Sequence, residues 1–240
     1  MRPDLHSHTT ASDGVLEPDE LLLRAEQHGV DLLAITDHDT VAGLQRVTYR
    51  GPVRLVSGIE FSTRWSGRGV HVVGLAIDPD SDGIREAVGT QQQARLERAR
   101  RIGERLDRLG AQNSFQGACT IAGGESIGRP HFARHLVDSG FCDSVQTAFS
   151  RYLGDGKPGD IKHTWPSLEQ AVRWIEDDGG TAVLAHPARY RLTATRLRRL
   201  VEDFTAAGGR AIEVICGSQP PHWTRSLAAL AAERGPVSYT

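Results

Sequence analysis

The chain has 240 residues, with 28 Lys plus Arg against 30 Asp plus Glu, and the formal net charge of −2 argues against a broad surface that coats DNA or RNA. Its length is ample for a buried core, and its three widely separated cysteines give neither a disulfide framework nor a metal-type pair, so a reducing compartment is expected. Neither a signal peptide nor an apolar run of roughly 18 residues is visible, so we expect a cytoplasmic protein with no membrane partner.

The first part of the chain alternates between predicted strands and helices. Strands are predicted to end near Leu5 and to span 31–36, 53–59 and 70–77, and helices to span 17–28 and a short stretch from about Thr40. The helix over 17–28 has an apolar stripe, with Pro18 in its first turn and Gly29 as its stop. The apolar run in 31–36 is typical of a buried parallel strand. This alternation predicts an α/β fold with a parallel sheet.

The middle of the chain is predicted to be mainly helical, and the α/β alternation returns after it. Helices are predicted over 82–110, 130–139, 143–153, 167–178, 193–207 and 220–234, and strands over 181–185, 211–215 and from Val237. We therefore expect an α/β domain made of residues 1–81 and 166–240. Residues 82–165 are expected to form a helical insertion that packs against this domain or caps it.

Imidazole and carboxylate side chains lie at or near the ends of the predicted strands. They are His6 and His8 after the first strand, Asp37 and His38 after the second, Glu60 at the end of the third, His71 in the fourth and His186 after the strand 181–185. Each residue alone is most simply a hydrogen-bonded core or surface residue. Because the carboxyl ends of parallel strands meet at one edge of a sheet, the whole set is expected to converge. Clustered imidazoles and carboxylates are costly to bury without an ion, so this set favours a metal site.

The residue types restrict the class of ion. Imidazole and carboxylate without thiolate favour manganese, iron, zinc or magnesium over copper(I) or an iron–sulfur cluster. The set has more ligands than one ion needs, so two or three ions are expected. Neighbouring ions can hold a hydroxide between them and stabilise both oxygens of an in-line displacement at phosphorus. We therefore expect the metal-held hydroxide, and no side chain, to be the nucleophile.

Five segments of the chain resemble the PHP (polymerase and histidinol phosphatase) superfamily. They are residues 5–14 (with His6-Ser7-His8 and Asp13-Gly14), residues 35–40 (with Asp37-His38-Asp39), Gly58-Ile59-Glu60, His71, and Leu184-Ala185-His186-Pro187. Residues 127–134 and 179–187 are similar to one bacterial branch of this superfamily. That branch contains nucleoside 3′,5′-bisphosphate phosphatases and the 5′→3′ exoribonuclease called ribonuclease AM.

The resemblance implies a distorted (β/α)7 TIM-like barrel with a helical insertion over the site. It implies that the metal ligands are His6, His8, Asp13, His38, Glu60, His71 and His186, with Glu60 bridging two ions. The centre would contain two or three divalent ions, with manganese as the expected metal and iron, zinc or magnesium as alternatives. The implied enzyme is a metal-dependent hydrolase of phosphate esters. It would act on nucleoside 3′,5′-bisphosphates or on short 5′-phosphorylated RNA and release a 5′-mononucleotide.

The C-terminal residues depart from the family pattern. The family closes its site with an Asp-x-His motif on the last strand, whereas this sequence ends at Pro236-Val237-Ser238-Tyr239-Thr240. We therefore expect the last strand to be cut short before the motif. Two alternatives stay open: a general phosphomonoesterase of the histidinol-phosphatase type, and a non-catalytic domain that binds metal or a nucleotide.

Arginines of the middle segment are candidates for holding substrate phosphate. Arg95, Arg98, Arg101, Arg105 and Arg108 share one stripe of the helix predicted over 82–110. The last three are expected at the surface, while Arg95 and Arg98 are either a solvated face or substrate ligands. The resemblance places Arg129 and His131 over the site, where an arginine can bind phosphate with two parallel hydrogen bonds. The expected partner is a small nucleotide or a short RNA.

Overall fold

The computed structural model describes residues 1–123, 127–161, 164–217, 219–234 and 237–239. The chain divides into two compact units, Met1–Gly89 with Pro166–Thr240, and Thr90–Trp165. Each has its own apolar core. Among the described residues, no helix combines the length and the apolar character needed to cross a membrane.

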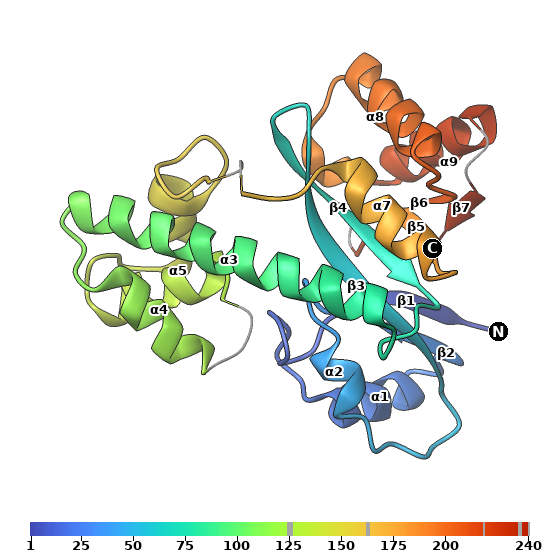
Figure 1. Cartoon of the computed structure of the whole chain (residues 1–240), viewed down its shortest axis with the longest axis horizontal. Coiled ribbons are helices and arrows are strands. Elements are labelled where there is room, and N and C mark those ends of the chain that lie inside the picture. Colours follow the sequence, from blue (N-terminus) through green and yellow to red (C-terminus); the bar gives the residue numbers. More distant parts are fainter. Residues whose placement is uncertain (124–126, 162–163, 218, 235–236, 240) are drawn as a thin grey trace. The chain divides into compact units, whose positions relative to one another are not determined.

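A mixed sheet of seven strands forms the first unit, as Figure 1 shows. The strands are β1 (Pro3–Ser7), β2 (Leu32–Ile35), β3 (Arg54–Trp65), β4 (Arg68–Leu75), β5 (Thr181–Leu184), β6 (Ala211–Glu213) and β7 (Val237–Tyr239), and they neighbour one another in this order. Strands β1, β2 and β3 are parallel, as are β5, β6 and β7. The α/β class predicted from the sequence is therefore confirmed.

The prediction of an all-parallel sheet is wrong at β4, which pairs antiparallel with both β3 and β5. Strands β3 and β4 form a hairpin whose two-residue turn, Ser66 and Gly67, has φ values of 46° and 74°. Two consecutive residues with positive φ match the right-handed twist of the flanking strands and close a tight hairpin. The hairpin also extends β3 to Trp65, beyond the predicted end at Ile59.

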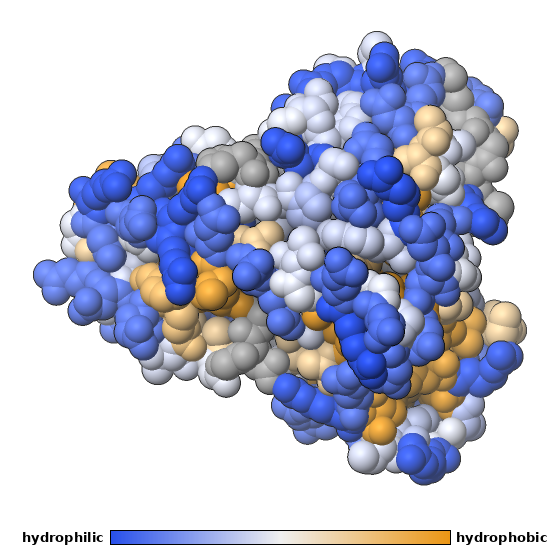
Figure 2. Space-filling view, viewed as in Figure 1, coloured by the Kyte–Doolittle hydropathy of each residue, from blue (hydrophilic) through white to orange (hydrophobic). Residues whose placement is uncertain are grey.

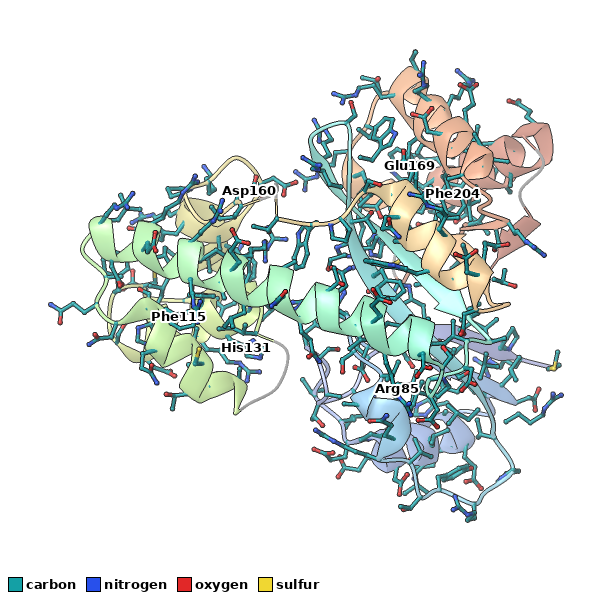
Figure 3. The ribbon with its side chains drawn as sticks, viewed as in Figure 1. Arg85, Phe115, His131, Asp160, Glu169 and Phe204 are labelled. Carbon is teal, nitrogen blue, oxygen red and sulfur yellow. The ribbon has the colours of Figure 1, made fainter. Side chains whose placement is uncertain are left out.

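Helices cover the sheet of this unit. They are α1 (Pro18–Gln27), α2 (Ala42–Gln45), α7 (Leu168–Asp177), α8 (Ala194–Ala206) and α9 (Pro221–Arg234), with a 3₁₀ turn η2 (Pro187–Tyr190) after β5. In Figure 1, α1 and α2 lie beside β1 and β2, and α7, α8 and α9 lie beside β4 to β7. Side-chain oxygens of Ser167 and Thr193 accept hydrogen bonds from the first turns of α7 and α8, which fixes where these helices begin. Phe204 of α8, labelled in Figure 3, is fully buried in the main core.

The second unit is helical around a separate core. Helix α3 (Asp82–Arg108) starts among the residues of the first unit and continues into the second, which also contains α4 (Ser114–Ala122), α5 (Arg129–Asp138), α6 (Val145–Ala148) and the π-helical turn η1 (Phe149–Leu153). Its core contains Ile102, Leu106, Phe132 and Leu136. Helix α4 was not predicted; it has nine residues and contains Gly117, a poor helix former. Hydrophilic residues cover most of the face of the molecule drawn in Figure 2.

Candidate metal centre

The structure brings together all seven residues that the resemblance assigned as metal ligands, within the first unit. His6 lies in β1, His8 and Asp13 in the loop after it, His38 after β2, Glu60 in β3, His71 in β4 and His186 two residues after β5. Glu60 was expected at the end of its strand, but it lies in the middle of β3 and pairs with Val73 of β4. The site therefore extends across five neighbouring strands of the sheet.

The carboxylate of Glu60 lies at the centre of the cluster and is fully buried. Nitrogen atoms of five histidines surround it: Oε2 lies 3.2 Å from His6 Nε2, 3.0 Å from His8 Nε2 and 3.2 Å from His38 Nδ1, and Oε1 lies 2.9 Å from His71 Nδ1 and 2.8 Å from His186 Nε2. Although Oε2 is buried, none of its contacts with the described residues has the geometry of a hydrogen bond. A carboxylate oxygen in this state is costly, and a cation would remove the cost.

The spacing of the donor atoms fits divalent metal ions. Ligand atoms that each lie about 2.1 Å from one ion are about 3.0–3.4 Å apart in octahedral or tetrahedral geometry. The nitrogen–oxygen separations around Glu60 run from 2.8 to 3.2 Å, close to this range. Three groups of donors have atoms within 4.8 Å of one another: His6, Glu60 and His186; His8, Asp13 and His38; and His38, Glu60 and His71. Glu60 and His38 each belong to two groups, an arrangement suited to ligands shared between neighbouring ions.

The pKa values of His6 and His8 are raised, because the nearby carboxylates together have a larger effect than burial. Burial lowers the pKa of His6, but the carboxylates of Glu213 and Glu60 raise it to about 9. Burial likewise lowers the pKa of His8, but Asp13 and Glu60 raise it to about 10. Burial would raise the pKa of Glu60, yet the surrounding imidazoles hold it well below its usual value. Binding of a metal ion to His6 or His8 would therefore release a proton.

The other two shifted histidines are neutral at pH 7. Burial lowers the pKa of His38 to about 3, against the attraction of Glu60. Burial also lowers the pKa of His186, again outweighing Glu60. A neutral imidazole carries the lone pair that metal binding requires. His186 adopts φ 30°, a left-handed conformation that costs a non-glycine residue free energy and is concentrated at functional sites.

Glu213 supports the centre and was not singled out in the sequence. Its Oε2 accepts a hydrogen bond of 2.6 Å from the backbone N–H of His186 and lies 3.2 Å from His6 Nδ1. A carboxylate that holds the proton of one ring nitrogen leaves the lone pair of the other for a metal. Glu213 therefore orients His6 with Nε2 toward Glu60. The sequence feature that could have revealed this role is a single carboxylate within the apolar run of residues 211–215.

Asp37 fixes the loop that carries His8. Its buried carboxylate accepts hydrogen bonds from the backbone N–H of Thr9 at 2.7 Å, from Thr9 Oγ1 at 2.6 Å and from Ser12 Oγ at 2.6 Å. The loop turns so tightly that a Cβ on Gly14 would collide with the backbone carbonyl of His8. Glycine and a buried carboxylate thus set the position of this part of the site.

The substrate-binding candidates lie in the second unit. Arg95 and Arg98 are buried, and their guanidinium groups lie 5.3 and 5.2 Å from the ring centre of Trp165. They also donate hydrogen bonds to the backbone oxygens of Ile127 at 3.2 Å and Ile161 at 2.8 Å. Cation–π stacking and these hydrogen bonds stabilise the fold of the second unit.

Arg129 and His131 begin α5, on which Figure 3 labels His131. Arg129 Nη1 donates a hydrogen bond of 3.0 Å to the backbone oxygen of Leu153, and 33% of its side chain is exposed. The backbone N–H of Gly128 donates a hydrogen bond of 3.0 Å to His131 Nδ1, which is buried. The proton of the His131 ring therefore lies on Nε2. Of the four substrate-binding candidates, Arg129 has the most exposed side chain, because Arg95, Arg98 and His131 are buried.

Comparison with known proteins identifies the family. The chain is 45% identical over 219 residues to a 3′,5′-nucleoside bisphosphate phosphatase from Chromobacterium violaceum, covering 90% of this chain and 77% of that protein. It is 43% identical over 235 residues to the 5′-3′ exoribonuclease Rnm from Escherichia coli, covering 96% of this chain and 80% of that protein.

Two solved structures are similar to this chain over nearly its whole length. An amidohydrolase from Chromobacterium violaceum, solved with sulfate and without metal, superposes with a TM-score of 0.91 at 42% identity over 99% of this chain and 85% of that one. A chain from Bifidobacterium adolescentis assigned as a metal-dependent phosphoesterase gives 0.85 at 28% identity over 98% and 85%. The model of the PHP domain family matches residues 4–134. Together with the cluster around Glu60, these matches show that the chain belongs to the PHP domain family.

Proposed function

We propose that the chain is a metal-dependent phosphoesterase that hydrolyses the 3′-phosphoester of nucleoside 3′,5′-bisphosphates, of short 5′-phosphorylated RNA, or of both, releasing 5′-mononucleotides. The observation that carries this proposal is the buried carboxylate of Glu60 with five imidazole nitrogens within 3.2 Å. Relatives that are 41–45% identical include a nucleoside bisphosphate phosphatase and 5′-3′ exoribonucleases, which supports the substrate class.

Two or three divalent ions would be held by the three donor groups, and manganese is the metal that we expect. The ligands would be His6, His8, Asp13, His38, Glu60, His71 and His186. When bound, ions of this kind activate water as a nucleophile and neutralise charge on the phosphoryl oxygens. Donor chemistry supports this proposal, because imidazole and carboxylate are the ligands that such ions take in phosphatases.

The protein's own side chains hold the centre in one arrangement. Glu60 Oε1 faces His71 and His186. Its Oε2 faces His6, His8 and His38, so one carboxylate contacts five of the proposed ligands. Glu213 holds the Nδ1 proton of His6. With these orientations fixed by burial and hydrogen bonds, little reorganisation is needed when phosphate arrives.

A second phosphate would be bound by Arg129 and His131, with Arg95 and Arg98 as further candidates. The partly exposed guanidinium of Arg129 supports this assignment, because a planar fork binds phosphate with two parallel hydrogen bonds. We also propose that residues 82–165 form an insertion that caps the substrate, and that the rest of the chain forms a (β/α)7 barrel. The location of the protein in the cytoplasm is a further prediction.

The function can be tested by comparing 3′,5′-bisphosphoadenosine with adenosine 3′-monophosphate in the presence of Mn²⁺. Because the monophosphate cannot form the charged hydrogen bonds made by a 5′-phosphate, kcat/KM should be about tenfold or more higher for the bisphosphate. Equal values, with histidinol phosphate cleaved as well, would indicate a general phosphomonoesterase. Fewer than two ions per chain together with no turnover would indicate a non-catalytic binding domain.

A further inference from the structure

A cavity of about 480 Å³ lies in the first unit, beside the metal centre and outside it. Its lining includes Ala188, Arg189, Arg191, Cys216, Gln219 and Trp223. It is bounded on one side by η2, which begins directly after His186, and on the other by the start of α9. Cys216 on its wall lies three residues after Glu213, whose carboxylate lies 3.2 Å from His6 Nδ1. Its volume is within the range of about 300–1,000 Å³ typical of small-molecule sites.

The arginine-bearing wall of the cavity is rigid. Between Arg189 and Arg191, the hydroxyl of Tyr190 donates a hydrogen bond of 2.8 Å to the backbone oxygen of Ala185 and accepts one of 2.8 Å from the backbone N–H of His71. Arg191 itself adopts the left-handed conformation, with φ 49°. Non-glycine residues keep this conformation only where the surrounding structure holds them in it. The side chains of Arg189 and Arg191 therefore extend from a well-fixed backbone.

The two arginines are available for a ligand. Both are exposed, and neither guanidinium makes an ion pair or a hydrogen bond with any residue that the structure describes. On the opposite wall, the Trp223 ring is half-buried and packs against the main core, which fixes its orientation. Gln219 next to it is held by a hydrogen bond of 2.8 Å to Thr224 Oγ1. Proteins that bind single-stranded nucleic acid use cationic side chains to bind the phosphates and aromatic rings to stack on the bases. An arginine can bind a phosphate with two parallel hydrogen bonds.

We propose that this cavity is a subsite for the RNA nucleotide that follows the scissile phosphate, with Arg189 and Arg191 on its phosphodiester and Trp223 stacked on its base. This inference rests on the proposed function. A bisphosphonucleotide has two phosphates: one is cleaved at the metal centre and the other is assigned to the second unit. Neither remains for Arg189 and Arg191. RNA has a further phosphodiester at the next nucleotide, so the cavity selects RNA over the mononucleotide.

Kinetics on two substrates test the selectivity. In the double variant Arg189→Ala and Arg191→Ala, the ratio of kcat/KM for a 5′-phosphorylated trinucleotide to that for 3′,5′-bisphosphoadenosine should fall about tenfold or more. Arg198→Ala, at an exposed arginine of α8 outside the cavity, is the matched control and should keep the wild-type ratio. An equal loss on both substrates, or no change in the ratio, would overturn the subsite.

Binding without turnover separates this inference from the proposed function. A fluorescent 5′-phosphorylated trinucleotide is titrated into each protein in the presence of a chelator. The double arginine variant and Trp223→Ala should bind about tenfold or more weakly, while Trp223→Phe, which keeps a stacking ring and guards against misfolding, should stay close to wild type. Removing one phosphate-binding arginine should also reduce the slope of log K against log salt by about 0.7. A double arginine variant that binds with the wild-type affinity and salt slope, or a Trp223→Ala variant that binds with the wild-type affinity, would refute the subsite, even when the wild type hydrolyses both substrates.

Discussion

Replacing Glu60 with glutamine tests the metal centre most directly. The side chain keeps its size but loses its charge, and one oxygen becomes an NH₂ group that faces imidazole nitrogens. Of the three donor groups, the two that contain Glu60 lose a ligand, whereas the group of His8, Asp13 and His38 does not. We therefore expect Glu60→Gln to retain at most the ion of this third group.

The size of the effect follows from the position of Glu60. Removing a carboxylate that only supports a ligand lowers metal affinity about 10–100-fold. Glu60 faces the donors directly and is fully buried, so its replacement should lower the affinity of both groups about 100-fold or more. Hydrolysis of 3′,5′-bisphosphoadenosine should be lost together with the metal.

The assay measures both properties on the same samples. Proteins are equilibrated by dialysis against buffered Mn²⁺, their metal content per chain is determined by plasma mass spectrometry, and hydrolysis is then measured. Glu169→Gln, the same change at the exposed carboxylate of α7 labelled in Figure 3, is the matched control, and circular dichroism checks the fold of both. Wild-type metal content in Glu60→Gln, or wild-type hydrolysis after its metal is gone, would refute the assignment.

Three further predictions concern the surroundings of the centre. Glu213→Gln removes the charge beside His6, so Mn²⁺ affinity measured by chelator competition should fall about 10–100-fold, and unchanged affinity would show that Glu213 does not orient His6. Tyr190→Phe removes a hydroxyl that bridges two backbone groups, so the free energy of unfolding in urea should fall by about 1–3 kcal/mol, and an unchanged midpoint and slope would contradict this. In the metal-free protein, folding raises the pKa of His6 to about 9 and of His8 to about 10, so their stabilisation is complete below pH 6.5 and is lost as the pH rises to about 10. Denaturation in the presence of a chelator should show this decline, and a pH-independent free energy of unfolding would rule it out.

The ligand set could be read from the sequence because its residues stand next to strongly apolar strands. The runs at residues 32–35 and 182–185 are short and uniformly apolar, so their ends, and the His38 and His186 that follow, are easily placed. The long helix α3 and the helices after β5 were equally clear, because their apolar residues repeat with helical spacing.

The longest strand was harder to predict. Strand β3 contains buried Glu60, Ser62 and Thr63, which break its apolar pattern, so the predicted strand stopped before them. Their burial depends on β4 folding back onto β3, a tertiary event that a short window of sequence does not contain. The Ser66-Gly67 turn was the local sign of this hairpin.

Arginine side chains were the least predictable part of the site. A stripe of arginines on α3 indicates either a solvated face or a ligand site, and the stacking of Arg95 and Arg98 on Trp165 depends on a residue far along the chain. Arg189 and Arg191 carried no signal, because arginine is the common cation throughout this sequence.

The donors of the centre lie in or shortly after five adjacent strands, from His6 in β1 to His186 after β5. An ion bound there is also a cross-link, and one that binds only the folded chain at 100 times its Kd adds about 2.7 kcal/mol to the free energy of unfolding. Scarcity of metal would then shorten the life of the polypeptide as well as slow its turnover, because a chain that opens more often is cut more often by proteases.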